Sequence, residues 1–484
     1  MHILKKTRSI CPECFKILEA NIFEEDNKVY IRKECKEHGI FEDVYWSDVH
    51  EYKRAQKYAV IGEGVSNPTQ ETNLGHPFDC GLCPNHKSGI DLAIIDVTNR
   101  CNLRCPICFA NAAVAGYVYE PTVEQIRKML KTLKDVKPIP PNAIQFSGGE
   151  PTIREDLPKL IRIAKEVGFD HVEVNSNGLK LAESLDYCKS LFEADVSTIY
   201  LQFDGVTPDV YLKTRGCDLF SIKLKAIENC RKAGFKSIVL VPTVVKGVND
   251  HQLGDIIRFA AENFDIIRCV NFQPVSITGR IDYGKRREMR ITLPDCMKLV
   301  EKQTEGQVKV SDFYPVPVVF PVSRAVSALK GERYPEFTVH EHCGVATFLL
   351  VDKDKLTPIT HYVDVDKFLT SLDSVYKKAS EGHKRLAQVQ LLSSSLRTVN
   401  LGLLKQLLGS VFKDASYDSL GNFMSKILMI GMMHFQDPYN FDLERVERCG
   451  ICYAVPDGRI IPFCAMNTLH RKKIEKDFSV SKKN

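Results

Sequence analysis

The sequence of 484 residues has no run of about twenty apolar residues, the length that a membrane-spanning helix needs. Met1 precedes a basic stretch that contains a cysteine and no apolar segment, so no secretory leader is expected. The formal net charge of +5 is too small to indicate a nucleic-acid partner. We therefore expect a cytoplasmic protein, and the composition leaves open a peripheral contact at the inner face of a membrane.

Low-complexity stretches are also scarce, and 44% of the residues are apolar, which is typical of an ordered chain with several domains. Disulfides are not expected in a reducing compartment, although the chain has 17 cysteines. These cysteines divide into buried thiols and candidate metal ligands. The buried thiols are expected to be Cys188, Cys230 and Cys296, which fall in amphipathic helical patterns, together with Cys217 and Cys269.

Cys101, Cys105 and Cys108 follow an apolar, strand-like segment at residues 91–99. Thiolates at this spacing can hold three corners of a 4Fe-4S cluster and leave the fourth iron without a protein ligand. Such an iron is open for chemistry. The alternative is a structural zinc site whose fourth ligand comes from elsewhere in the chain.

Polar, glycine-rich turns follow three apolar runs downstream of these cysteines, and they weigh against the zinc alternative. The turns are Ser147-Gly148-Gly149-Glu150-Pro151, Asn175-Ser176-Asn177-Gly178 and Gln202-Phe203-Asp204-Gly205. An α/β barrel places its ligand-binding groups at such turns. Gly148 and Gly149 would let the backbone come close to a ligand.

Residues 94–290 alternate between strand-like and helix-like segments, which predicts parallel βαβ units. Strands are expected at residues 143–146, 171–177, 197–204, 237–245 and 266–275, and helices at residues 122–136, 156–169, 183–194, 220–235 and 253–264. About six units follow the three cysteines, which predicts a partial (β/α)6 barrel rather than a closed eightfold one.

The cysteine loop and the turns together resemble the radical S-adenosylmethionine (SAM) family. The resemblance implies that the open iron binds the amino and carboxylate groups of SAM and cleaves it reductively to a 5′-deoxyadenosyl radical. It also implies that Glu150, in the GGEP loop, meets the SAM amino group. Asn175, Asn177 and Asp204 would be ribose-side or substrate-side contacts by the same analogy.

Residues 1–50 contain two ligand pairs, Cys11 with Cys14 and Cys35 with His38, on either side of a β-like stretch. This spacing predicts a zinc-ribbon or rubredoxin-like knuckle with four donors around one metal ion. So short a segment could hardly fold without such a metal. Both zinc and iron suit the ligand set, so the metal is left open.

Six further cysteines remain, in a connector at residues 51–93 and in a region at residues 291–484. They are Cys80, Cys83, Cys343, Cys449, Cys452 and Cys464. A hairpin turn at residues 456–458 would fold Cys464 back towards Cys449 and Cys452. The six resemble auxiliary iron-sulfur ligation of the SPASM type, which implies one or two auxiliary 4Fe-4S clusters. A second zinc site is the alternative for the last three.

Residues 291–448 contain apolar segments that suit a hydrocarbon ligand. Residues 313–323 are interrupted by prolines, which predicts extended chain, and Cys343 is expected to follow a strand at residues 337–342. Residues 396–412 and 420–435 are helix-like, and the second segment carries a methionine cluster: Met424, Met429, Met432 and Met433. Methionine adapts to irregular apolar shapes. These segments predict a lipid-binding cap, although an ordinary helical core would give the same pattern.

Motifs along nearly the whole chain resemble the archaeal tetraether synthase family. They are the N-terminal knuckle and the stretches DCGLCPNHK, NRCNLRCPICFANA, QFSGGEPT, YLQFDG, VNFQPVSITGR and RCGICYAVPDG. The resemblance implies an enzyme that joins terminal methyl carbons of isoprenoid diether lipids by hydrogen abstraction and sp3–sp3 bond formation. Its products would be tetraether or macrocyclic diether membrane lipids. Two SAM molecules per bond, an external electron donor and an auxiliary cluster would be needed.

Alternative interpretations remain for the head-group contacts and for the activity. Five arginines are candidates for lipid head-group contacts because guanidinium suits phosphate, and surface solvation explains them equally well: Arg215, Arg280, Arg286, Arg287 and Arg290. The alternative enzyme is a radical SAM methyltransferase that acts on a pterin-like small molecule, a label given to close relatives. The alternative of another class is a non-catalytic zinc-ribbon or iron-sulfur scaffold, or a nucleic-acid adaptor.

Overall fold

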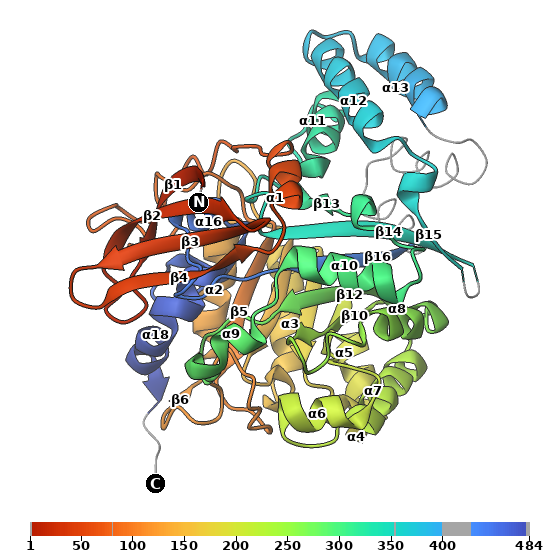
Figure 1. Ribbon diagram of the computed structural model, residues 1–484. Helices are drawn as coiled ribbons and strands as arrows, with labels where there is room; N and C mark the ends of the chain where they lie inside the picture. Colours follow the sequence, from red (N-terminus) through yellow and green to blue (C-terminus); the bar gives the residue numbers. More distant parts are fainter. Residues whose placement is uncertain (1, 80, 353–354, 399–426, 481–484) are drawn as a thin grey trace.

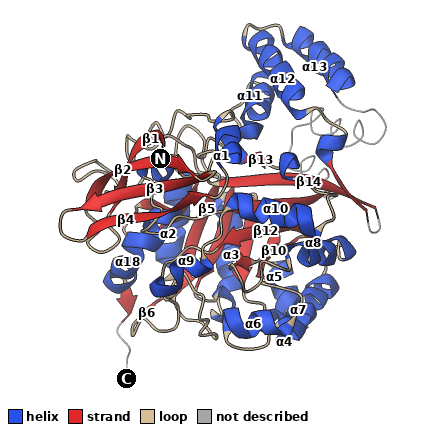
Figure 2. Ribbon diagram, viewed as in Figure 1, coloured by secondary structure: helices blue, strands red, loops and turns tan. Residues whose placement is uncertain are grey.

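The computed structural model describes residues 2–79, 81–352, 355–398 and 427–480. Two sheets organise the chain: a small antiparallel sheet at the N-terminus and a long mixed sheet that includes the central barrel (Figure 1). Helices surround the barrel part of the long sheet (Figure 2). A short pairing of β6 (Val118–Tyr119) with β19 (Ser479–Val480) attaches the C-terminal residues to the loop after the first barrel strand.

The N-terminal sheet is an antiparallel meander with the strand order β1-β2-β3-β4. Its strands are β1 (His2–Ile10), β2 (Ile17–Glu25), β3 (Lys28–Cys35) and β4 (Gly39–Trp46). Buried and less buried residues alternate along β3, because successive side chains of a strand point to opposite faces. The buried face packs into the main hydrophobic core together with α1 (Val49–Gln56), which begins at the N-cap Asp48.

Six parallel strands form the barrel in the order β5-β7-β8-β9-β10-β12, which confirms the predicted partial (β/α)6 barrel. The strands are β5 (Leu92–Thr98), β7 (Ala143–Gly148), β8 (His171–Ser176), β9 (Thr198–Gln202), β10 (Ile238–Val241) and β12 (Ile267–Pro274). The surrounding helices are α2 (Val123–Lys134), α3 (Leu157–Val167), α4 (Leu179–Glu183), α5 (Leu185–Glu193), α6 (Pro208–Arg215), α7 (Phe220–Ala233), α8 (Leu253–Glu262) and α10 (Leu293–Gln303). Apolar strand residues such as Ile144, Val172 and Ile199 are fully buried beneath these helices.

Strands from the C-terminal part of the chain extend the sheet beyond both edges of the barrel. Next to β12 lie β16 (Leu428–Met433), β14 (Gly344–Asp352) and β13 (Tyr314–Pro315), and β15 (Lys355–Pro358) pairs with β14. Next to β5 lie β17 (Ile451–Ala454) and β18 (Ile460–Pro462), which form the predicted hairpin around residues 456–458. Residues 434–450 therefore connect the two edges of the barrel.

Several short elements lie between the longer ones. They include η1 (Pro151–Ile153), β11 (Thr243–Val244), α9 (Arg286–Met289), α16 (Leu443–Glu447), α17 (Phe463–Ala465), the π-helical turn η6 (Met466–His470) and α18 (Arg471–Asp477). Helix α16 lies beside β1, so the C-terminal region also contacts the N-terminal sheet.

Three local predictions in the C-terminal region are wrong. Residues 428–433 form strand β16 instead of a helix, because they pair with β12 on one side and β14 on the other, and this pairing outweighs their helix-like spacing. Residues 320–323, the end of the predicted extended segment 313–323, begin helix α11 (Phe320–Lys330) instead, because Pro321 lies in the first turn, where no backbone donor is needed. Residues 337–342 form a loop before β14 instead of a strand.

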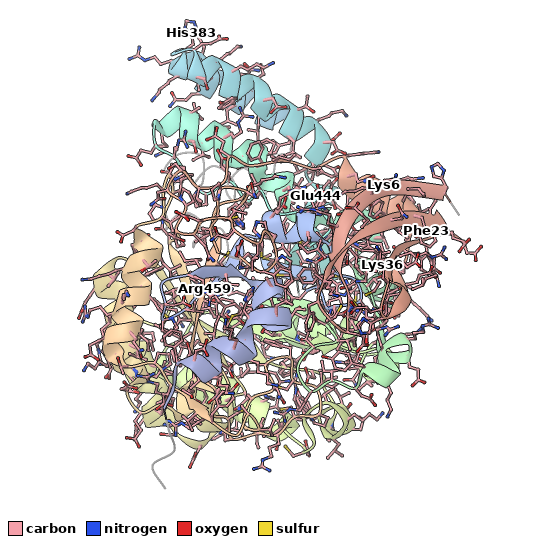
Figure 3. The ribbon with its side chains drawn as sticks, turned by 90° about the vertical axis from the view of Figure 1, so that its left-hand side faces the viewer. Lys6, Phe23, Lys36, His383, Glu444 and Arg459 are labelled. Atoms are coloured by element: carbon pink, nitrogen blue, oxygen red, sulfur yellow. The ribbon has the colours of Figure 1, made fainter. Side chains whose placement is uncertain are left out.

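Helices α11 (Phe320–Lys330), α12 (Val365–Ser380) and α13 (Lys384–Thr398) form a small bundle that stands away from the barrel (Figure 1). His383, between α12 and α13, marks the far end of this bundle (Figure 3). Met424 and most of the predicted helix at residues 396–412 lie outside the described residues. Among the helices that are described, none is long and apolar enough to cross a membrane.

Candidate active site and metal centres

The loop after β5 carries Cys101, Cys105 and Cys108, and all three line one cavity of about 290 Å³ at the barrel opening. All three side chains are half-buried. Burial raises the pKa of Cys101 to about 12 and also raises the pKa of Cys105. A bound metal would therefore be needed to keep these thiols ionised at neutral pH. The donor set and its position suit a three-cysteine iron-sulfur cluster.

The turn after β7 lies tightly against the cysteine loop. The Gly149 amide donates to the Thr98 oxygen at 2.7 Å, and the Glu150 amide donates to the Arg100 oxygen at 2.8 Å. Gly148 has a φ of +132°, and a Cβ atom at either glycine would collide with the backbone of residues 98–100. The two glycines are therefore required by this close approach.

Glu150 is buried, and its carboxylate is held from behind by the turn after β8. Its two oxygens accept hydrogen bonds from the Thr152 hydroxyl at 2.6 Å, the Ser176 hydroxyl at 2.8 Å and the Asn177 amide at 2.7 Å. Burial raises the pKa of Glu150, and these hydrogen bonds oppose that rise. The same carboxylate also lines the cavity, so it is preorganised to accept a cationic group there.

Asn175 and Asn177 line the cavity, as expected for ligand contacts, whereas Asp204 does not. Asp204 is fully buried, and its carboxylate accepts hydrogen bonds from Arg215 at 2.5 and 2.8 Å. The Arg215 guanidinium lines the cavity and donates to the Ile107 oxygen at 3.0 Å. The structure therefore places Asp204 as the residue that positions Arg215.

A layer of polar side chains from the barrel strands lines the same cavity, and the sequence analysis missed it. The layer consists of Gln145, Glu173, Tyr200, Asn271 and Gln273. Gln145 donates to Glu173 at 2.8 Å, and Asn271 and Gln273 donate to the Tyr200 hydroxyl at 2.5 and 3.1 Å. The only sequence signal was a polar residue inside an otherwise apolar strand, such as the glutamine of AIQF.

The other candidate arginines serve the fold or lie at the surface. Arg290 is buried between Asp43 and Asp437, with ion pairs of 3.0 and 2.6 Å, and Arg286 also pairs with Asp43. Arg280 donates to the main-chain oxygen of Ala112, and Arg287 is exposed. A cluster of phosphate-binding arginines is therefore not formed by these residues.

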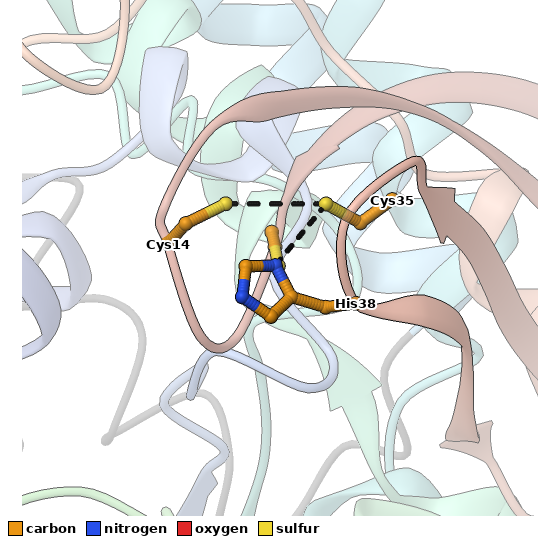
Figure 4. A group of neighbouring side chains, drawn as sticks. Cys14, Cys35 and His38 are labelled. Atoms are coloured by element: carbon orange, nitrogen blue, oxygen red, sulfur yellow. Dashed lines mark hydrogen bonds between the residues drawn. The ribbon is translucent and has the colours of Figure 1, made fainter.

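The four predicted ligands of the N-terminal knuckle converge (Figure 4). The Cys35 sulfur lies 3.4 Å from His38 Nδ1 and 3.9 Å from the Cys14 sulfur, and the Cys11 sulfur lies 3.7 Å from the same histidine nitrogen. The hydrogen bond with His38 lowers the pKa of Cys35 to about 6. Three thiols and one imidazole around a common centre suit a tetrahedral metal ion.

Three of the six remaining cysteines, Cys343, Cys449 and Cys464, lie close to Arg445, and a fourth, Cys452, is hydrogen-bonded to Cys449. Burial raises the pKa of Cys343 and of Cys464, and the charge of Arg445 opposes both rises. The Cys83 sulfur contacts His76 Nε2 at 3.0 Å. Cys80 lies outside the described residues.

Comparison with known proteins agrees with this geometry. Residues 95–260 match the radical SAM superfamily, and residues 3–47 match the HMPTM N-terminal zinc ribbon domain. The chain is therefore a radical SAM enzyme that uses SAM and a 4Fe-4S cluster, with a metal site in its N-terminal ribbon.

A relative over almost the full length defines the family more closely. The 7,8-dihydro-6-hydroxymethylpterin dimethyltransferase of Methanocaldococcus jannaschii is 52% identical over 98% of this chain and 96% of its own length. This chain belongs to the family of that protein. A GTP 3′,8-cyclase of Clostridium acetobutylicum is 26% identical over 43% of this chain and 63% of its own length. The solved structure of Streptococcus suis SuiB bound to SAM is 18% identical, with a TM-score of 0.37 over 46% of this chain and 48% of its own.

These findings correct the family and the substrate expected from the sequence. The motifs predict a tetraether synthase, but the relative with 52% identity is named as a pterin dimethyltransferase. The expected isoprenoid lipid substrate, the lipid-coupling reaction and the role in tetraether biosynthesis are therefore wrong. The lipid prediction rests in part on a methionine-rich helix. Met429, Met432 and Met433 instead belong to strand β16, which pairs with β12 and β14.

Proposed function

We propose that this protein is a radical SAM methyltransferase that methylates a reduced pterin related to 7,8-dihydro-6-hydroxymethylpterin. The observation that carries this proposal is the 52% identity with the pterin dimethyltransferase over 98% of the chain, which includes the barrel, the ribbon and the C-terminal region. The polar layer inside the barrel supports it, because a pterin ring carries donors and acceptors along its edges.

The residues around the cavity divide into two groups in this proposal. Cys101, Cys105 and Cys108 hold the cluster that binds SAM, which supplies a 5′-deoxyadenosyl radical when it is reductively cleaved. Glu150 accepts the SAM ammonium group, because its carboxylate is already oriented by the hydroxyl and amide donors behind it. Asn175 and Asn177 contact SAM or the substrate from the turn after β8.

The polar layer holds the heterocycle. Glu173 accepts from Gln145 at 2.8 Å and contacts His171 at 3.1 Å, so its carboxylate is fixed by the neighbouring strand β7 and by its own strand β8. A fixed carboxylate can accept the adjacent N–H groups of a pterin ring, and the Tyr200 hydroxyl and the Asn271 amide supply further polar contacts. Enclosure within the barrel keeps other hydrogen donors away from the reacting carbon.

The C-terminal cysteines hold an auxiliary metal centre in this proposal. Cys343, Cys449, Cys452 and Cys464 supply four sulfur donors in a buried region, and four thiolates complete the ligand set of a 4Fe-4S cluster. Cys80 and Cys83 remain candidates for a second site. The auxiliary centre would exchange electrons with an external donor.

The test is an anaerobic incubation of the purified protein with SAM, a reductant and 7,8-dihydro-6-hydroxymethylpterin. We expect 5′-deoxyadenosine and a pterin product that has gained the mass of one CH₂ unit for each methyl group added. Cys105→Ala should abolish both products, whereas Cys217→Ala, at a thiol assigned no metal, should retain them. Stimulation of 5′-deoxyadenosine formation by another cell fraction, with the pterin recovered unchanged, would contradict the proposal.

A further inference from the structure

Arg445 is a buried cation that forms no ion pair with a carboxylate among the described residues. Helix α16 places it among the C-terminal cysteines, and it is one of the largest fully buried side chains. Its Nε donates to the Cys343 sulfur at 3.3 Å, and its Nη2 donates to the main-chain oxygen of His434 at 2.6 Å. Throughout the described chain, no aspartate or glutamate forms an ion pair with it. The guanidinium lies 5.7 Å from the ring centre of Tyr45.

Other buried arginines differ from Arg445 in their ion pairs. Each of these pairs with at least one carboxylate: Arg215, Arg290, Arg448 and Arg471. Arg448, three residues after Arg445, pairs with Glu341 at 2.9 Å. A buried charge without a counter-charge is strongly unfavourable. The Arg445 guanidinium therefore requires a nearby anion, and no carboxylate among the described residues forms an ion pair with it.

Sulfur is prominent among the groups that face Arg445. The Cys343 sulfur accepts the hydrogen bond from Nε at 3.3 Å, and a further side-chain neighbour, Tyr45, presents its ring to the guanidinium. Neutral thiols cannot balance a guanidinium, whereas thiolates that ligate iron can. A 4Fe-4S centre with four thiolate ligands carries a net negative charge, so it supplies the missing anion.

We propose that Arg445 is the counter-ion of an iron-sulfur cluster bound by Cys343, Cys449, Cys452 and Cys464, and that it raises the reduction potential of this cluster. The physical reason is twofold. A nearby positive charge favours the more negative, reduced state, and a hydrogen bond to a ligand sulfur acts in the same direction. This inference rests on the auxiliary cluster proposed above, and it does not depend on the identity of the substrate.

The experiment uses the full chain with Cys101→Ala, Cys105→Ala, Cys108→Ala, Cys80→Ala and Cys83→Ala, so that neither the SAM-binding site nor a site at Cys80 and Cys83 contributes a cluster signal. In this background we compare Arg445, Arg445→Lys and Arg445→Met after anaerobic reconstitution. Iron and sulfide content and a redox titration followed by electron paramagnetic resonance are measured. Metal bound to the N-terminal knuckle and far-ultraviolet circular dichroism report the fold of each variant.

We expect Arg445→Met to decrease the equilibrium constant for cluster reduction about tenfold, which is a shift of about 59 mV for a one-electron couple. Arg445→Lys should keep the midpoint close to that of the background, because it keeps the charge. Loss of the cluster in Arg445→Met alone, with the knuckle metal retained, would also support a counter-ion.

Two results would overturn the inference. One is an Arg445→Met variant with a full cluster and an unchanged midpoint. The other is equal loss of the cluster in the lysine and methionine variants, which would show that shape rather than charge matters. A background protein that binds no iron beyond the knuckle would overturn the cluster itself. Methylation by the intact chain is measured separately, so that outcome is distinguishable from failure of the proposed function.

Discussion

The N-terminal knuckle and the C-terminal cysteine group bring sulfur atoms together in different ways. The knuckle takes its four ligands from residues 11–38, on the turns of one small meander. The C-terminal group joins Cys343, which precedes β14, to cysteines near β17 and β18 at the opposite edge of the sheet. One site is therefore assembled by local turns, and the other by the whole barrel.

The electrostatic surroundings of the two sites differ as well. In the knuckle, His38 is exposed and its hydrogen bond lowers the pKa of Cys35 to about 6. In the C-terminal group, burial raises the pKa of Cys343 and Cys464, and a buried guanidinium opposes it. A local site can thus rely on its own ligands, whereas a buried site needs charge compensation from the surrounding fold.

The largest predicted effect tests whether the N-terminal sheet is stable independently of the barrel, as the local origin of the knuckle ligands suggests. Arg290→Met should destabilise the protein by about 3–5 kcal/mol, because it leaves Asp43 of β4 and Asp437 buried without their shared cation. Chemical denaturation measures this change. The partly exposed pair of Arg32 with Glu42 is the control, and Arg32→Met should change stability by about 0–1 kcal/mol. Equal effects would mean that the buried pairs do not join the sheet to the barrel.

Metal analysis of Cys35→Ser tests the separation of the two sites. We expect this variant to lose the knuckle metal and to retain the iron bound elsewhere, because no ligand of the knuckle belongs to the cysteines around Arg445. Cys449→Ser should show the reverse pattern. Element analysis of both variants by mass spectrometry also identifies the knuckle metal as zinc or iron. Simultaneous loss of both metals in Cys35→Ser would show that the sites are coupled.

The pH dependence of the metal-free protein should differ between the two sites. The Cys35 pKa is lowered from 9.0 to about 6, so its thiolate stabilises the fold above pH 9, and this stabilisation is lost as the pH falls through about 6. Urea titrations of the metal-free protein should show that the free energy of unfolding decreases as the pH is lowered from 9.0 to about 6. His38→Ala should flatten this dependence, because it removes the main cause of the lowered pKa.

Alkylation provides a second measurement of the same difference. At neutral pH, Cys35 in the metal-free protein should react with iodoacetamide faster than Cys464, whose pKa burial raises. Peptide mapping gives both rates. Faster reaction of Cys464 would contradict the assigned surroundings of the two thiols.

The smallest predicted effect concerns the helix that follows the knuckle sheet. Asp48→Ala should cost about 1 kcal/mol, because Asp48 caps α1 by accepting from the Glu51 amide at 3.1 Å. Asp48→Asn keeps the cap and loses only the ion pair with Lys298, so its thermal stability should stay close to that of the wild type. A larger loss in the asparagine variant would mean that the ion pair, rather than the cap, joins this helix to α10.

Much of the barrel was predictable because its signals are local. Alternating apolar strands and amphipathic helices predicted the six parallel strands, and spacing alone grouped Cys11, Cys14, Cys35 and His38. The predictions failed where a partner distant in sequence decided the result. Residues 428–433 became a strand through pairing with β12 and β14, and Asp204 was assigned to ligand contact although Arg215 occupies its carboxylate.

The substrate prediction failed for a related reason. Motifs such as the cysteine loop report the cofactor chemistry that many enzymes share, whereas substrate choice depends on side chains that line the barrel. Gln145, Glu173 and Tyr200 lie on three different strands, and no spacing in the sequence joins them. Their common surface exists only after the strands are laid side by side.

By itself, the sequence determined the class of chemistry, the six-strand barrel and the knuckle ligands, because short-range spacing fixes backbone turns and the donors they carry. Only the tertiary structure decided that Asp204 supports Arg215, that residues 428–433 extend the sheet and that Arg445 donates to Cys343 without an ion pair to any described carboxylate. These outcomes depend on contacts between residues far apart in the chain. Their energies come from burial and charge pairing, which exist only once the barrel has closed around them.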